Sequence, residues 1–258
     1  MISKTGIQWT GGTYNPWYGC KKISEGCKFC YMYRDREYSG VDASIVIKSK
    51  PETFYKPMYN DVQSLIFTCS WSDFFNPEAD EWRPEVWGII KNTSHEYQIL
   101  TKRPERILEC LPPDWGSGYE NVWLGVSVEN QDKLSRVGVL SEVPAKTKFV
   151  SFEPLLGEIN LSKTQINSID WAIIGGESGD LDGNYGFRKC ELSWIETLVD
   201  DLKEGSVPIF VKQLGTYIAI KNGLKDSKKG GDMIEFPPHL KIREFPNGLR
   251  YQDDAIYF

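Results

Sequence analysis

The sequence lacks any apolar run long enough to cross a bilayer, and its N-terminal stretch MISKTGIQWTGG lacks the apolar core of a signal peptide. Cysteines are few for a chain of this size, six in 258 residues, which excludes a disulfide scaffold. Positive charge is also in short supply, because 30 Lys and Arg against 36 Asp and Glu give a net charge of −6. That balance argues against a protein that coats duplex DNA, although it is compatible with a local basic groove. We therefore expect a cytoplasmic protein without a membrane segment.

No internal repeat or low-complexity tract interrupts the first two hundred residues; short apolar runs alternate instead with amphipathic stretches. Near-continuous apolar runs are typical of strands that are buried on both faces of a parallel sheet. The predicted strands are residues 6–10, 44–49, 64–70, 96–101, 121–128, 147–153, 170–177 and 207–213, and the predicted helices are residues 27–38, 83–93, 103–111, 128–140 and 193–205.

This alternation predicts an α/β protein with right-handed crossovers, either a doubly wound sheet or a full or partial TIM-type barrel. Polar residues gather at the C-terminal end of strand after strand, where barrel enzymes place their sites. We therefore favour a partial (β/α) barrel of about six to seven parallel strands.

The character of the sequence changes near residue 216. The stretch KNGLKDSKKGGD (221–232) is charged and contains glycine, and EFPPHLKIREFP (235–246) resembles an extended segment more than another βα unit. We expect residues 1–216 to form the barrel and residues 217–258 to form a C-terminal extension packed on it.

Three of the six cysteines, Cys20, Cys27 and Cys30, lie within eleven residues of one loop, in a C-x6-C-x2-C pattern. Loop cysteines flanked by lysine and glycine are poor core material, which argues against inert packing residues. One interpretation is a [4Fe–4S] cluster with three irons held by the protein and the fourth open. The other is a zinc site completed by a remote ligand, for which the candidates are Cys69, Cys110, Cys190, His95 and His239. Structural zinc sites usually pair two ligand knuckles, and the absence of a second C-x2-C or H-x3-H favours the cluster.

The cysteine loop resembles that of radical S-adenosylmethionine (SAM) enzymes, including Phe29 before the last cysteine and Tyr31 after it. Six residues separate Cys20 from Cys27, where most of that superfamily has three. Over about residues 5–216 the chain also resembles, in the same order, a phage-associated family of radical-SAM-like proteins of unknown function. The segments that carry this resemblance are YNPWYGC (14–20), SWSDFF (70–75), QILTKRPERI (98–107), NVWLGVSVENQ (121–131), SFEPLLGEI (151–159), DWAIIGGESG (170–179) and FVKQLG (210–215).

The resemblance implies a radical SAM enzyme whose cluster is held by Cys20, Cys27 and Cys30 and whose open iron chelates the amino and carboxylate groups of SAM. Reduction of the cluster then cleaves SAM to a 5′-deoxyadenosyl radical, so an electron donor is implied. Some genes of the family neighbour a three-Cys-motif partner protein. The phage association favours modification, rearrangement or repair of a nucleobase, nucleotide or nucleic acid. The alternative is a non-enzymatic zinc- or cluster-stapled module that binds nucleic acid or a partner protein.

Six successive predicted strands end in small polar or charged residues, which together predict a pocket at one edge of the sheet. The chemistry of SAM suggests roles for them: acceptors for its ammonium group, a cation for its carboxylate, and an acid–amide pair for its ribose hydroxyls. The predicted SAM-binding residues are Ser70, Ser72 and Asp73 for the ammonium group, Lys102 and Arg103 for the carboxylate, and Ser127, Glu129 and Asn130 for the ribose.

The segment GGESG has two interpretations. Gly175, Gly176 and Glu177 either let the backbone approach adenine or substrate closely, or form a tight turn into the next helix. Its spacing is not that of a dinucleotide fingerprint. Glu153 and Lys212 are the candidates for substrate contact or proton transfer, and the alternative for each is a structural ion pair inside the barrel.

Overall fold

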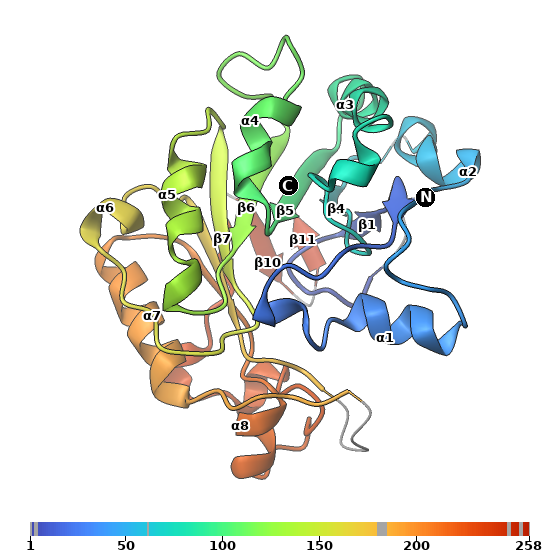
Figure 1. Cartoon of the computed structure of the whole chain (residues 1–258). Helices are drawn as coiled ribbons and strands as arrows, with labels where there is room; N and C mark the ends of the chain where they lie inside the picture. Colours follow the sequence, from blue (N-terminus) through green and yellow to red (C-terminus); the bar gives the residue numbers. More distant parts are fainter. Residues whose placement is uncertain are drawn as a thin grey trace.

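A computed structural model describes residues 2, 5–60, 62–179, 185–246, 249–252 and 255–257 of the chain. Seven parallel strands form its main sheet, and each is hydrogen-bonded to the next along the chain, with β1 and β9 at the two edges. The strands are β1 (Gly12–Tyr14), β4 (Leu65–Thr68), β5 (Glu96–Thr101), β6 (Val122–Ser127), β7 (Thr147–Phe152), β8 (Trp171–Gly175) and β9 (Ile209–Gln213). The sheet curls into a partial (β/α) barrel, as the sequence predicts (Figure 1).

Helices α3, α4, α5 and α7 follow one another around the outside of the curved sheet in Figure 1. The α-helices are α1 (Tyr31–Tyr38), α2 (Pro51–Phe54), α3 (Arg83–Lys91), α4 (Ile107–Cys110), α5 (Ser135–Ser141), α6 (Lys163–Ile166), α7 (Leu192–Glu204) and α8 (Thr216–Lys221). Two small antiparallel sheets pair β2 (Trp17–Tyr18) with β3 (Ile47–Lys48), and β10 (Arg250–Gln252) with β11 (Ala255–Tyr257). In the ranges that the structure describes, no helix has the length and apolarity to cross a membrane.

The strands predicted from residue 64 onward and the helices predicted at 83–93 and 193–205 are confirmed. The helices predicted at 103–111 and 128–140 open with 3-10 turns, and their α-helical parts are only α4 and α5. The early elements also need correction. Residues 6–10 form a turn instead of a strand, because Trp9 packs its ring against Phe67 of β4, with 4.6 Å between the two ring centroids. Residues 44–49 contribute only the exposed β3, which pairs outside the main sheet. The helix predicted from residue 27 begins at Tyr31, after a 3-10 turn at Glu25–Cys27.

The period-two alternation of side chains gives the sheet two separate apolar cores. The core on the convex face includes residues of α3 and α7, so it lies under the helices. The core on the concave face is mainly aromatic and consists of Trp9, Leu65, Phe67, Trp123, Phe149, Trp171, Ile173, Phe210 and Phe245. Aromatic side chains therefore fill the barrel interior, and polar strand-end residues are left for its C-terminal edge.

The C-terminal extension contacts the sheet along β9. The backbone N–H of Val211 donates to the carbonyl of Ile242 at 2.9 Å, and the N–H of Glu244 donates to that of Ile209 at 2.8 Å. Beyond this pairing, the Phe245 ring stacks on Trp171 with a centroid separation of 5.1 Å. The extension thus supplies an aromatic ring to the concave core.

Truncating that ring tests its contribution to stability. We expect Phe245→Ala to lower the free energy of unfolding by about 3 kcal/mol, because a buried ring is lost and a cavity is left beside Trp171. Ile234→Ala is the control, since Ile234 is 82% exposed and its truncation costs less than about 0.5 kcal/mol. Urea unfolding measures both; equal values for the two variants would contradict the packing of Phe245.

Candidate functional site

The cysteine loop leaves the sheet region after β2 and ends at the start of α1. Gly19 has φ +90°, and a Cβ there would lie 2.0 Å from the carbonyl oxygen of Ile45, so only glycine fits this crossing. The N–H of Cys20 then donates to the carbonyl of Ala43 at 2.9 Å. Cys27 ends the 3-10 turn, and Cys30 precedes the first residue of α1. All three thiols are free and partly buried.

The three thiols differ in electrostatic environment. Burial, followed by the charge of Asp73, raises the pKa of Cys20 to about 12, although the Arg103 guanidinium opposes this shift. Burial also raises the pKa of Cys30. Burial acts in the same direction on Cys27, but Lys102 and hydrogen bonds from the Ile23 and Ser24 backbones outweigh it, so the pKa of Cys27 is lowered. Cys27 is therefore the thiol best prepared to bind metal as thiolate.

Three thiols are the type of ligand that an iron–sulfur cluster takes. Burial and then the charges of Cys20, Cys30 and Cys27 raise the pKa of Tyr33 to about 12, so all three thiols act on one neighbouring ring. Lys102 favours the thiolates of Cys27 and Cys30. In the described ranges, no three His, Cys, Asp or Glu side chains are already gathered at metal-binding distance.

Asp73 and Arg103, predicted to bind the ends of SAM, form a buried ion pair with 3.0 Å between Oδ2 and Nη1. Asp73 also accepts hydrogen bonds from Thr101 Oγ1 and from the backbone N–H of Lys102. Arg103 donates to the carbonyl of Lys21 at 2.9 Å, and its Nη1 lies 3.7 Å from Cys20 Sγ. The pair thus ties the end of β5 to the cysteine loop.

Glu129, predicted for the ribose, is only 1% exposed and lies under the cysteine loop. Its carboxylate accepts hydrogen bonds from Ser24 Oγ at 2.6 Å and from Arg136 Nη1 at 2.8 Å. Lys102 Nζ lies 3.9 Å from Oε1. A Cβ on Gly26 would come within 2.5 Å of the Glu129 side chain, so the loop sits directly on this carboxylate.

The smaller predicted residues differ in whether their side-chain oxygens already have hydrogen-bond partners. Ser70 Oγ exchanges hydrogen bonds with Asn15, and Ser72 Oγ donates to the carbonyl of Gly19 at 2.5 Å. Ser127 is buried. Asn130 differs from these, because within the described ranges its Oδ1 is buried and accepts no hydrogen bond. An unfilled acceptor that directly follows Glu129 in the chain suits a ligand hydroxyl or amine.

Glu153 and Lys212 form an ion pair with 2.5 Å between Oε1 and Nζ. Both side chains remain partly exposed, at 17% and 22%. Gly175 leaves room for this pair, because a Cβ there would lie 3.1 Å from Glu153 Oε1. A Cβ on Gly176 would lie 2.2 Å from the carbonyl oxygen of Leu214, so the adjoining backbones are in close contact.

Glu177 is 5% exposed and binds Arg188, a residue that the sequence reading missed. Arg188 Nη2 lies 2.5 Å from Oε1, and its Nε and backbone N–H each donate to Oε2 at 2.9 Å. The remaining nitrogen, Nη1, donates to the carbonyl of Glu25 in the cysteine loop at 2.9 Å. The sequence analysis also missed Arg136 and Ser24, which bind Glu129. Only Arg136 could have been found from the sequence, because it lies seven residues after Glu129 on the same predicted helix.

The remote residues considered as a fourth zinc ligand have other surroundings. Cys69 follows β4 with φ +64°. Burial, together with the negative charges of Asp73 and Cys20, raises the pKa of its thiol. The others are engaged elsewhere: Cys110 between Arg83 and Arg106, Cys190 in the convex core, His95 on the carbonyl of Pro57, and His239 on Glu196.

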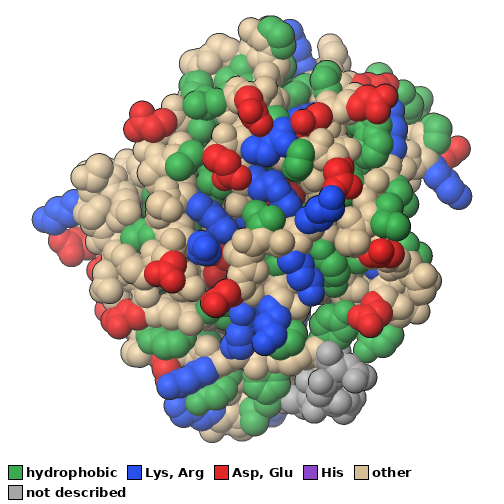
Figure 2. Space-filling view, in the orientation of Figure 1, with side chains coloured by type: hydrophobic (Ala, Val, Ile, Leu, Met, Phe, Trp, Pro, Cys, Tyr) green, Lys and Arg blue, Asp and Glu red, His purple; other side chains and the backbone are tan. Residues whose placement is uncertain are grey.

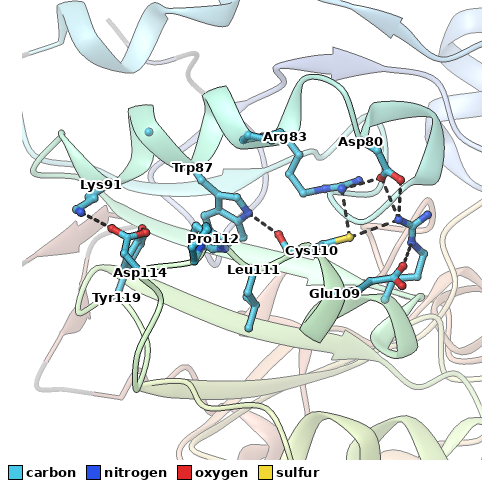
Figure 3. A pocket seen from close by; sticks show the side chains of 14 residues that line it. Asp80, Arg83, Trp87, Lys91, Glu109, Cys110, Leu111, Pro112, Asp114 and Tyr119 are labelled. Atoms are coloured by element: carbon cyan, nitrogen blue, oxygen red, sulfur yellow. Dashed lines mark hydrogen bonds and ion pairs between the residues drawn. The ribbon is translucent and has the colours of Figure 1, made fainter.

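Two grooves lie on the surface of the described residues, and Figure 2 shows Lys and Arg side chains gathered in a band down the middle of the molecule, in the orientation of Figure 1. The groove beside the cysteine loop has a volume of about 530 Å³, and its charged lining consists of Lys102, Arg103, Glu105, Arg106, Asp132, Lys133 and Arg136. The other, of about 620 Å³, lies between α3 and α4 (Figure 3). There Asp80 pairs with both Arg83 and Arg106, and both guanidinium groups approach Cys110 Sγ, at 3.2 and 3.4 Å. Glu109 also pairs with Arg106 at 3.0 Å, so two carboxylates offset the two guanidinium groups, and the cysteine loop remains the stronger candidate site.

Solved structures similar to the chain include spore photoproduct lyase. A double mutant with bound AdoMet and dinucleoside spore photoproduct has a TM-score of 0.51 and 10% identity, covering 80% of this chain and 75% of that one. A second structure, complexed with dinucleoside spore photoproduct, has a TM-score of 0.47 and 11% identity over the same shares. At these identities the likeness describes the fold.

The curled seven-stranded sheet, with its cysteine loop at the C-terminal edge, thus defines an α/β protein with a partial TIM-type barrel, a fold similar to that of spore photoproduct lyase. No curated protein matches the sequence. Residues 4–241 match the family described as Protein of unknown function (DUF5131), and the chain belongs to that family.

The contact between Gly26 and Glu129 can be tested by a double-mutant cycle. We expect Gly26→Ala to destabilise the metal-free protein by about 1–3 kcal/mol, because the new methyl group must displace a buried, paired carboxylate. The penalty should shrink in a Glu129→Ala background, where the obstruction is gone. Gly138→Ala is the control, since nothing lies within 4 Å of its Cβ position. Urea unfolding reports each value; an undiminished penalty in the Glu129→Ala background would refute the contact.

Proposed function

We propose that the protein is a radical SAM enzyme that binds a [4Fe–4S] cluster through Cys20, Cys27 and Cys30. The observation that carries this proposal is the set of three free thiols on one loop at the C-terminal edge of a partial barrel. Three thiolates leave one iron of such a cluster without a protein ligand, which is where SAM would bind. The fold likeness to a lyase with bound AdoMet supports the same function.

The surrounding residues suit a cluster that is held by charge. When bound, the cluster supplies the electron that cleaves SAM to a 5′-deoxyadenosyl radical. Lys102 and Arg103 favour the thiolate forms of the loop cysteines, and they would offset the negative charge of the bound group. Asp73 pairs with Arg103, and Glu129 lies 3.9 Å from Lys102. We therefore expect these two carboxylates to position the cations and not to contact a ligand themselves.

For SAM itself, Asn130 is the predicted residue with an unfilled acceptor. Lys102 retains some exposure, 22% of its side chain, and lies near enough to Glu129 to be steered by it. We assign Asn130 to the ribose and Lys102 to the carboxylate end of SAM. Ser70, Ser72, Ser127, Gly175 and Gly176 would shape the pocket through their backbone and small size.

We assign the substrate to the concave side of the barrel, beside the Glu153–Lys212 ion pair. This pair is partly exposed and stands above the aromatic core, so it can contact a polar substrate or move a proton. The similar lyase is bound to a dinucleoside spore photoproduct, which supports a nucleobase, nucleotide or nucleic acid as substrate class. The resemblance to the phage-associated family supports two further parts of the proposal. An external donor supplies the electron to the cluster, and a three-Cys-motif protein is a partner.

Anaerobic reconstitution with iron and sulfide, followed by reduction with SAM, tests the function. We expect about four irons per chain and formation of 5′-deoxyadenosine, both lost in Cys27→Ala because a thiolate ligand is removed. Cys110→Ser is the matched control, since Cys110 lies outside the loop and should leave both signals intact. Tightly bound zinc without 5′-deoxyadenosine would instead support the stapled binding module.

The role of Asn130 gives a separate prediction. We expect Asn130→Ala to weaken SAM binding about tenfold, the effect of one lost hydrogen bond, while the iron content stays unchanged. Asn167→Ala, an exposed residue at the C-terminal end of α6, should bind SAM as the wild type does. Isothermal titration of the reconstituted proteins measures both, and unchanged affinity in Asn130→Ala would remove Asn130 from the SAM site.

A further inference from the structure

The six-residue spacer between Cys20 and Cys27 is attached to the ends of three different strands. Following β5, Arg103 donates to the carbonyl of Lys21 at 2.9 Å. Following β6, Glu129 accepts from Ser24 Oγ at 2.6 Å. Following β8, the Glu177–Arg188 pair reaches the carbonyl of Glu25 through Arg188 Nη1 at 2.9 Å. The long spacer is therefore a fixed part of the site.

The contact from the end of β8, made by Arg188, holds the 3-10 turn Glu25–Cys27, which positions Cys27. The carbonyl of Glu25 accepts two hydrogen bonds, one from the N–H of Lys28 at 3.0 Å and one from Arg188. The first closes the 3-10 turn at Glu25–Cys27, and the second anchors that turn to the sheet. The Arg188 guanidinium also lies 5.4 Å from the centroid of the Phe29 ring, between Cys27 and Cys30.

Arg188 is itself held rigidly. Its contacts with Glu177 form a bidentate pair, and a carboxylate that is 5% exposed strongly favours keeping its cation. Three of its donors therefore have fixed directions, and the fork geometry is one that lysine cannot reproduce.

We propose that Arg188 is a positioning residue for the cysteine loop, which fixes the turn before Cys27 and thereby places Cys27 and Cys30 relative to Cys20. The proposal rests on the proposed function, in which these thiols hold a cluster. Arg188 acts on the loop through a carbonyl and a ring, and it contacts none of the three sulfurs in the described structure.

Hydrogen–deuterium exchange of the metal-free protein tests the anchor without any cluster. In Arg188→Ala we expect the amides of Cys27 and Lys28 to exchange about tenfold faster or more, because a charged hydrogen bond to their turn is lost. Arg188→Lys keeps a charge opposite Glu177 but should restore protection only in part. Lys189→Ala is the control, since Lys189 pairs with Glu191 away from the loop. Wild-type exchange in Arg188→Ala would overturn the proposal.

Reconstitution tests the consequence for the cluster. We expect Arg188→Ala to retain the wild-type circular dichroism but to bind less iron and to show an altered electron paramagnetic resonance spectrum on addition of SAM. Arg188→Lys should fall between that variant and the wild type. Wild-type iron content and spectrum in Arg188→Ala would overturn the positioning role. If the wild type itself forms no cluster, the proposed function fails, whereas the exchange experiment still decides whether Arg188 anchors the loop.

Discussion

The buried carboxylate of Glu129 joins three parts of the protein that must meet for the site to exist. It accepts from Ser24 of the cysteine loop and from Arg136 of α5, and it faces Lys102 at the end of β5. A carboxylate with 1% exposure is tolerated only when donors surround it, so burial makes these contacts mandatory. The loop must lie where its glycine can fit over the acid, and the cysteines take their places accordingly.

The same principle recurs on either side of Glu129. Asp73 holds Arg103 and Glu177 holds Arg188, and each arginine donates to a backbone carbonyl of the cysteine loop. The acidic strand-end residues thus act on the loop through these two arginines, of which Arg103 also lies 3.7 Å from Cys20 Sγ. This division leaves the partly exposed Glu153–Lys212 pair, and the buried Asn130 Oδ1 that accepts no hydrogen bond within the described ranges, as the polar groups that remain for a ligand.

The sequence predicted the later strands well because continuous apolar runs identify strands buried on both faces. It also located the cysteine loop and the strand-end residues, since both are local patterns. It could not reveal that Asp73, Glu129 and Glu177 bind arginines, because such pairs depend on how loops fold. Arg188, for example, is 163 residues from the Glu25 carbonyl that it binds. Residues 6–10 were misread because Trp9 serves the concave core from a turn.

The central claim is that three protein thiolates leave one position of a cluster open for SAM. Mössbauer spectroscopy of the ⁵⁷Fe-reconstituted protein, recorded with and without SAM, tests it most directly. A single iron of the cluster should change its isomer shift when SAM binds, while the three thiolate-bound irons keep theirs. Four irons that all stay unchanged, or that all respond alike, would contradict it.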